Sequence, residues 1–128
     1  TMNTEIRLDF QLLGTSIAPK EITELTGITP STSLLKGERN SKTVLPRQNI
    51  WSVESRADSD DIADHWAELE SILINSKEMF RKIAATGIAK MTVVINSKDR
   101  IPSIGIPASM SEFVGYVNAV IDIDHIQS

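Results

Sequence analysis

The sequence predicts an α+β fold: a single domain over residues 1–128 with about five strands in a mixed or mainly antiparallel sheet and three to four helices. Segments in which apolar residues alternate are interspersed with segments in which they recur every three to four residues. Two strand-like segments in the C-terminal part follow each other closely enough to form a hairpin. No glycine-rich turn joins a strand to a helix, so a doubly wound parallel sheet is not expected. The expected order of elements is β-α-β-α-α-β-β-α-β.

The first expected strand is Glu5–Leu13, where apolar and polar residues alternate as on a sheet with one wet face. A short helix follows, because Pro19 suits a first helical turn and apolar residues recur after it at helical spacing. Gly27 is suited to a left-handed C-cap, and Pro30 prevents the helix from continuing. Together these residues predict a strand, a helix and a tight exit from that helix.

The stretch Ser31–Pro46 is polar, carries scattered bases and is long for a loop, so we expect it to be the least ordered part of the domain. A second strand is expected at Ile50–Ser55, with Trp51 and Val53 on one face. This strand would return the chain to the sheet after the loop.

A long helix is expected from Asp58 or Ser59 to about Asn75, because its apolar residues fall on one stripe. That stripe consists of Ile62, Trp66, Leu69 and Leu73. Ser76 is placed to N-cap a third helix, and Gly87 to cap its C-terminal end. The inward-facing residues of the third helix are Met79, Phe80 and Ile83.

The strongest strand segment is Ala89–Asn96, whose β-branched residues predict an interior position in the sheet. Ile104–Ile106, bounded by prolines, is expected to return as its antiparallel partner. Ser109–Glu112 matches a capping box, which predicts the start of the last helix. The buried stripe of that helix consists of Met110, Phe113, Val114 and Val117. Val120–Ile126 is expected to close the sheet.

The composition is that of a globular domain with a core, at 41% apolar and 23% charged residues. The expected core includes Trp51, Trp66, Leu69, Val93 and Phe113. The absence of cysteine excludes disulfides and thiolate metal sites. No apolar run approaches the roughly 20 residues of a membrane span, and no secretory signal opens the chain, where Thr1 is typical of an expression scar. We therefore expect a cytoplasmic bacterial protein that does not contact membranes.

Four motifs, taken in order, give the chain a family resemblance. They are Gly27–Ser31, Lys36–Glu38, Trp51 and Ile121–Asp124. In this order the chain resembles the bacterial "domain of unknown function 4279" family, over nearly its whole length. The resemblance implies the strand-helix-turn-strand arrangement described above. It implies no activity, because the family has no agreed function and no catalytic residues to carry over.

The charges are unevenly distributed, although the net charge is only −4. Residues 54–70 contain seven acids against one base, and residues 36–47 contain four bases against one acid. The negative balance argues against a nucleic-acid-binding protein, which is normally basic. We expect one acidic and one basic surface.

Three acids, Asp61, Asp64 and Glu68, share one face of the long helix, opposite its apolar stripe. We call them the helix ridge. As surface residues, none should be needed for folding. His65 lies within one turn of all three, so a metal or acid–base cluster is one interpretation. The other is that His65 flanks the apolar stripe while the acids are solvated and favoured by the helix dipole.

Asp122 and Asp124 project from the same face of the last strand. Paired carboxylates can perform acid–base catalysis, or bind a divalent ion together with the neighbouring His125. Alternation with apolar residues is equally typical of a wet outer face. A third interpretation is that the pair holds the basic loop by ion pairing.

The basic loop contains Lys36, Arg39, Lys42 and Arg47, with no aromatic residue between them on which a base could stack. These bases could contact phosphate or pair with the acidic helix of the same chain. Tyr116 falls on the polar side of the last helix, where it could anchor an interface or form the rim of the core.

The sequence favours a non-enzymatic, protein-binding domain, most concretely an immunity-type protein that neutralises a basic toxin, a nuclease being the natural candidate. The expected partner-binding residues are Asp61, Asp64, Glu68, Tyr116, Asp122 and Asp124. No catalytic residue, metal or cofactor is expected. The alternatives are a small-ligand or metal-dependent enzyme that uses the Asp-Ile-Asp-His strand with the basic loop as a lid, and an oligomeric structural module.

Overall fold

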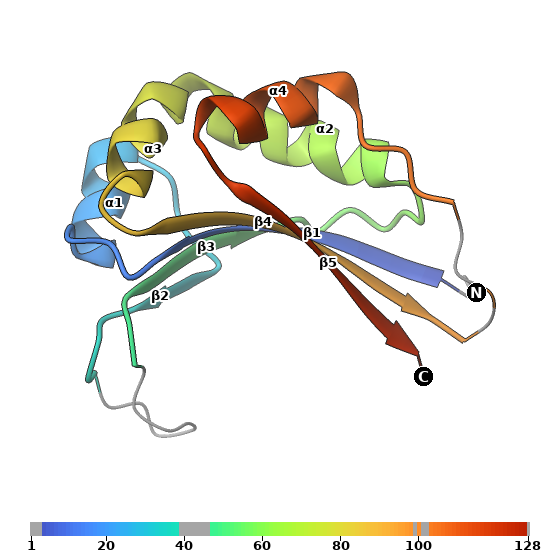
Figure 1. The fold of residues 1–128 in the computed structure, drawn as a ribbon, viewed down its shortest axis with the longest axis horizontal. Helices are drawn as coiled ribbons and strands as arrows, with labels where there is room; N and C mark the ends of the chain where they lie inside the picture. The colour runs from blue at the N-terminus through green and yellow to red at the C-terminus, as the bar shows by residue number, and fades with distance from the viewer. Residues whose placement is uncertain (1–3, 39–46, 99, 101–102, 128) are drawn as a thin grey trace.

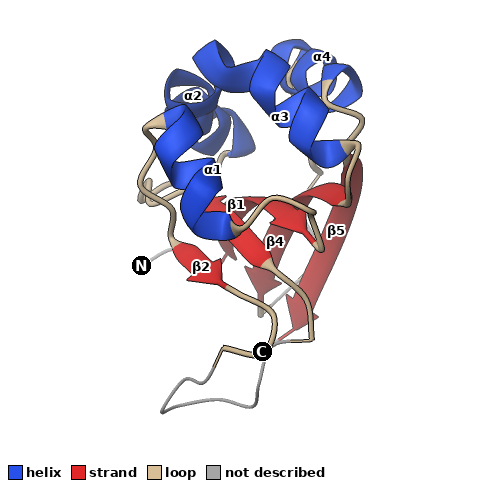
Figure 2. Ribbon diagram, turned by 90° about the vertical axis from the view of Figure 1, so that its left-hand side faces the viewer, coloured by secondary structure: helices blue, strands red, loops and turns tan. Residues whose placement is uncertain are grey.

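One mixed sheet, with its helices all on one side, forms the architecture (Figures 1 and 2). The computed structural model describes residues 4–38, 47–98, 100 and 103–127. The elements are β1 (Thr4–Leu13), α1 (Pro19–Thr26), β2 (Thr32–Leu34), β3 (Ile50–Glu54), α2 (Ile62–Leu73), the 3-10 turn η1 (Ile74–Ser76), α3 (Lys77–Ala84), β4 (Ile88–Ser97), α4 (Ala108–Tyr116) and β5 (Val120–Gln127). The predicted α+β class and its mixed, five-stranded sheet are confirmed.

The strands lie in the order β2-β3-β1-β4-β5, so β1 occupies the centre. β1 pairs antiparallel with β3 on one side and with β4 on the other, and β2 pairs antiparallel with β3. β5 runs parallel to β4, as the connection through α4 requires. The sheet is therefore mainly antiparallel, with one parallel edge strand.

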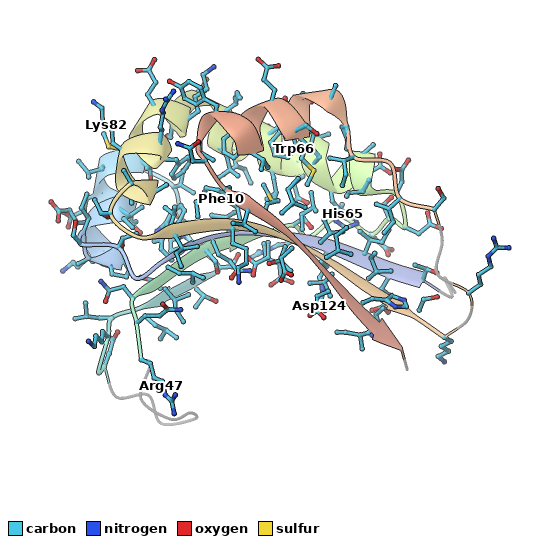
Figure 3. The ribbon with its side chains drawn as sticks, in the orientation of Figure 1. Phe10, Arg47, His65, Trp66, Lys82 and Asp124 are labelled. Carbon is cyan, nitrogen blue, oxygen red and sulfur yellow. The ribbon has the colours of Figure 1, made fainter. Side chains whose placement is uncertain are left out.

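The core lies between the helices and the sheet (Figure 3). Alternation along β1 directs Ile6, Leu8, Phe10 and Leu12 toward the helices, where all four are buried. The Phe10 ring packs edge-on against Phe80 from α3 and Phe113 from α4, with centroids 5.1 and 5.5 Å apart. The predicted core of Trp51, Trp66, Leu69, Val93 and Phe113 is confirmed, and so are the predicted stripes of α2 and α4.

One expected strand is wrong and another was not foreseen. Ile104–Ile106 is not a strand, because β4 already has β1 on one edge and β5 on the other. Its two isoleucines instead pack, partly buried, against the core. The unforeseen strand is β2, which pairs with the outer edge of β3 inside the stretch expected to be loop. Residues 39–46 of that stretch lie outside the described residues.

Two helix ends differ from the expectation. Ser109 does not cap α4; the N-cap is Pro107, and no side chain caps the helix. The Ser109 hydroxyl instead accepts a hydrogen bond from the Trp66 indole N–H at 2.8 Å. Gly87 is not the C-cap of α3; the C-cap is Ala85, which has a right-handed conformation. A Cβ at position 87 would clash with the carbonyl oxygen of Leu13, so only glycine permits this close approach.

The start of α2 lies later than expected, at Ile62. Gly27 is confirmed as the left-handed C-cap of α1, with φ 71°. Ser76 precedes α3 but makes no side-chain capping hydrogen bond. Within the described ranges, the helices are too short or too polar to cross a membrane.

Candidate partner-binding surface

Two acids of the helix ridge hold the start of α2 in place. Asp61 is the N-cap, and its Oδ1 accepts a hydrogen bond from the backbone N–H of Ala63 at 2.9 Å. Asp64 accepts a hydrogen bond from the Ser59 hydroxyl at 2.6 Å. Such bonds satisfy donors that a helix start leaves free, and a negative charge there is favoured by the helix dipole.

The third ridge acid, Glu68, is half-buried and holds the segment that leads into α2. Its Oε1 accepts hydrogen bonds from the backbone N–H groups of Arg56 and Ala57, at 2.8 and 3.0 Å. All three ridge acids therefore have local structural partners, which their spacing along the helix did not indicate. Their assignment to a partner surface stays a prediction.

His65, which the sequence placed beside the ridge, is fully buried within a hydrogen-bonded network. Its Nε2 lies 2.8 Å from the Ser59 carbonyl oxygen, an acceptor, so Nε2 carries the proton. Nδ1 then accepts from the Ser55 hydroxyl at 2.7 Å, and the Ser55 oxygen accepts from the Leu8 N–H at 2.9 Å. Because Ser55 is 1% exposed and fully bonded, this serine–histidine pair joins β1, the end of β3 and α2 and offers no accessible nucleophile.

The face of the sheet away from the helices is polar along the middle of its strands, whereas a row at one end, formed by Leu34, Ile50, Leu13 and Ile88, is apolar. The register places Asp9 opposite both Glu54 and Thr92, and Thr92 in turn lies opposite Asp122. Residues opposite each other on neighbouring strands share a face, so this transverse row brings three carboxylates to the uncovered side. Arg7 from the same face pairs with Glu54, at 3.4 Å between Nε and Oε1. We call this side of the sheet the uncovered face.

Asp9, at the centre of the uncovered face, was not singled out by the sequence. Within the described residues its Oδ1 is buried and has no hydrogen-bond partner. Burial, and to a smaller extent the nearby Glu54 charge, raise the pKa of Asp9 from 3.8 to about 6, against the opposing effect of hydrogen bonds from Gln11 and Ser52. Asp9 is therefore a carboxylate whose charged form the fold does not fully stabilise.

Asp122 and Asp124 are exposed on β5 at one side of this face, and Figure 3 shows Asp124 on the side of the sheet away from the helices. His125 alternates to the opposite side of β5, where it is half-buried opposite Ile95. The two carboxylates and the imidazole therefore do not converge. Over the described part of the chain, no three His, Asp or Glu side chains gather as a ligand set for a metal ion.

Tyr116 is the last residue of α4, and α4 lies in the helix layer, on the other side of the sheet from the uncovered face (Figure 1). It is half-buried, and its ring contacts two cations of α3: Lys77 Nζ lies 4.9 Å and Arg81 Cζ 5.0 Å from the ring centroid. These cation–π contacts give Tyr116 intramolecular partners. The structure does not bring it together with Asp122 and Asp124.

The basic loop is described only at its ends. Lys36 and Arg47 are exposed, and Figure 3 shows Arg47 extending away from the domain. Neither forms a salt bridge with a helix-ridge acid; the ion pair found among the described residues joins Arg7 and Glu54. Arg39 and Lys42 lie outside the described residues.

A groove of about 470 Å³ lies beside α1 and β2 and has a mainly apolar lining. Lys20 and Glu38 are its ionisable lining residues, and Glu38 Oε2 accepts a hydrogen bond from the Leu35 N–H at 2.9 Å. This lining contains neither a histidine nor a pair of acids, so it does not present an acid–base set.

The comparison with protein families agrees with the resemblance carried by the four motifs. The profile of the family described as Domain of unknown function (DUF4279) matches residues 4–128. No curated protein and no solved structure matches the chain. The match extends from β1 to the end of β5 and so includes the helix layer and the uncovered face. The chain belongs to the DUF4279 family.

Proposed function

We propose that this domain is a non-enzymatic, protein-binding module of the immunity type, which neutralises a basic toxin, a nuclease being the natural candidate, by covering it with an acidic surface. The observation that supports this most directly is the position of Asp122 and Asp124. Both are exposed and neighbour each other on one face of β5, and among the described residues neither accepts a hydrogen bond like those of the helix ridge. Exposed acids of this kind speed association with a basic partner and select it.

The electrostatic environment of Asp9 supports the uncovered face as the surface that binds the basic partner. Asp9 carries a negative charge that its surroundings disfavour, through burial and the Glu54 carboxylate. A cationic side chain docked on the uncovered face would favour the charged form of Asp9 and would gain from it. Binding should therefore weaken as the pH falls through about 6, where Asp9 takes up a proton.

The proposal makes the uncovered face the main partner surface, and the helix ridge a secondary one. A partner that used Asp61, Asp64 or Glu68 would compete with the backbone N–H groups and the Ser59 hydroxyl that these acids already bind. Loss of an N-cap acceptor such as Asp61 costs about 0.5–2 kcal/mol. Asp122 and Asp124 carry no such cost.

The experiment is co-purification with the product of the neighbouring reading frame, followed by calorimetry at low and high salt. Replacing Asp122 and Asp124 by Lys should weaken binding by at least about tenfold and reduce its salt dependence. The matched control replaces Asp58 and Asp60, two exposed acids before α2, and should change affinity far less. Equal losses of affinity in both variants would mean that the partner responds to the overall charge of the domain and not to this face. Unchanged affinity in both variants would exclude this face as the partner surface.

An oligomeric module is the second candidate, because apolar side chains on β5 are exposed. Ile121 and Ile123 are 38% and 54% exposed on the side of the strand opposite the two acids. Sedimentation of the purified chain over a range of concentrations tests this candidate. A concentration-dependent dimer would support it.

A further inference from the structure

We infer that β5 accepts an extended segment of the partner as an added strand of the sheet, and that this segment carries basic side chains at alternate positions with apolar ones between them. The inference rests on the proposed function and specifies how the basic partner is held. β5 lies at the edge of the sheet, and no described strand pairs with its outer side (Figure 2). The N–H and C=O groups along such an edge are free to pair with another chain.

The two edges of the sheet differ in how they are protected. β2, at one edge, is three residues long and follows Pro30 closely. Short strands and nearby prolines are common means of blocking unwanted strand pairing. β5, at the other edge, has eight residues and contains neither proline nor lysine. Its length and composition favour pairing with another strand.

The side chains of β5 define what the added strand must carry. On the uncovered face, Asp122 and Asp124 would lie opposite alternate residues of the new strand, where Lys or Arg forms the favourable cross-strand pair. On the other side, the exposed Ile121 and Ile123 would pack against apolar residues. In strand addition, the backbone supplies affinity and the alternate side chains supply specificity.

The same acids disfavour a second copy of this chain as the occupant. If β5 paired antiparallel with its symmetry mate about Ile123, each Asp122 would face the second copy's Asp124. A shift to the register centred on Asp122 would place that residue opposite itself. Like charges directly opposite each other destabilise a strand pair. A basic, alternating segment meets neither obstacle.

The probe is a synthetic peptide, Val-Lys-Val-Lys-Val with blocked ends, titrated into the full chain and followed by amide chemical shifts. The expected result is saturable shifts confined to β5 and the adjoining β4, with slowed hydrogen exchange at β5 amides. Two control peptides separate the contributions. One carries a backbone N-methyl group at every residue, which removes the residue donors of both its edges, and the other replaces Lys by Glu. Each should bind at least tenfold more weakly, on the scale of about 1.4 kcal/mol per factor of ten.

The protein variant Asp122→Lys with Asp124→Lys should weaken binding of the Lys peptide by a similar factor and strengthen binding of the Glu peptide. The matched Asp58 and Asp60 variant should leave both unchanged. Full affinity of the N-methylated peptide would overturn strand addition but leave an acidic docking face, and so the proposed function, intact. Absence of any shift with the Lys peptide would overturn the inference, whereas failure of the proposed function requires loss of binding to the basic protein partner itself. If the chain forms a dimer that prevents peptide binding, the strand added to β5 would be that of a second copy, and the inference of a basic partner segment would be overturned.

Discussion

The acids of the helix ridge and the acids of β5 have the same chemistry but different surroundings. On α2, Asp61 and Glu68 lie where backbone N–H groups lack partners, and each accepts hydrogen bonds from them. On β5, Asp122 and Asp124 lie on a strand whose backbone pairs with β4, so their carboxylates point to solvent. A cluster of acids therefore indicates a binding surface only after its local hydrogen bonds have been accounted for.

The largest loss of stability is expected on the buried side of α2, opposite the helix ridge. Replacing Trp66 by Ala should lower the free energy of unfolding by about 3–5 kcal/mol, as for other buried aromatics. The ring packs 5.5 Å from Phe113, and its indole N–H binds Ser109. Denaturant unfolding measures the loss. Trp66→Phe, which keeps most of the packing and removes the hydrogen bond, should lose less, and equal losses would assign the effect to the hydrogen bond.

The second prediction concerns the helix ridge itself. Replacing Asp61, Asp64 and Glu68 together by Lys should destabilise the fold by about 2 kcal/mol or more, through loss of the N-cap and of the Glu68 acceptor. This differs from the sequence-based expectation that the ridge is not needed for folding. The isosteric control, Asp61→Asn with Glu68→Gln, keeps the acceptor oxygens and should retain most of the stability. A ridge variant as stable as wild type would show that the hydrogen bonds of these acids do not stabilise the fold.

The third prediction uses the raised pKa of Asp9. Above about pH 6 the native state must carry a charge that the fold disfavours, whereas the unfolded chain ionises near 3.8, so Asp9 lowers stability as the pH rises between these values. Asp9→Asn should therefore stabilise the protein at pH 7 by about 1–2 kcal/mol, a value reduced for solvent screening, and by much less near pH 4. Unfolding curves at several pH values test this. A gain that does not change with pH would have another origin.

The smallest effect on stability is expected at β5. Asp122→Asn with Asp124→Asn should change the free energy of unfolding by less than about 0.5 kcal/mol, because both side chains are exposed. The same variant should nevertheless weaken binding of a basic partner. Chemical unfolding beside calorimetric titration measures both quantities on one sample. A large loss of stability would mean that these acids, like the helix ridge, have a structural role.

The sequence predicted those parts of the fold that depend on periodicity. Alternation from Ile6 to Leu12 and the apolar stripe of α2 placed the core correctly, because each pattern extends over several residues. β2 was missed, since three residues do not establish a period. The prediction that Ser109 caps a helix is wrong because its hydroxyl binds Trp66, a residue distant in sequence.

The candidate site was predicted in part. Asp122 and Asp124 were named from their alternation, and the structure describes both as exposed on one face. Asp9 was missed, because its burial arises from the neighbouring strands β3 and β4 and not from its own segment. The Ser55–His65 pair was missed for the same reason, since neither residue indicates the other in sequence.

The hydrogen bonds at the end of β3 make the amide proton of Leu8 a reporter of local opening between α2 and the sheet. Ser55, just beyond the strand, donates its N–H to the Leu8 carbonyl oxygen at 2.8 Å and accepts the Leu8 N–H on its hydroxyl oxygen. That hydroxyl is in turn held by His65 of α2. The amide proton of Leu8 therefore exchanges with solvent only when Ser55 is released, an event linked to detachment of α2 from the sheet. Its exchange rate, read beside that of Phe10 on the same strand, would time the opening of the helix layer without any added label.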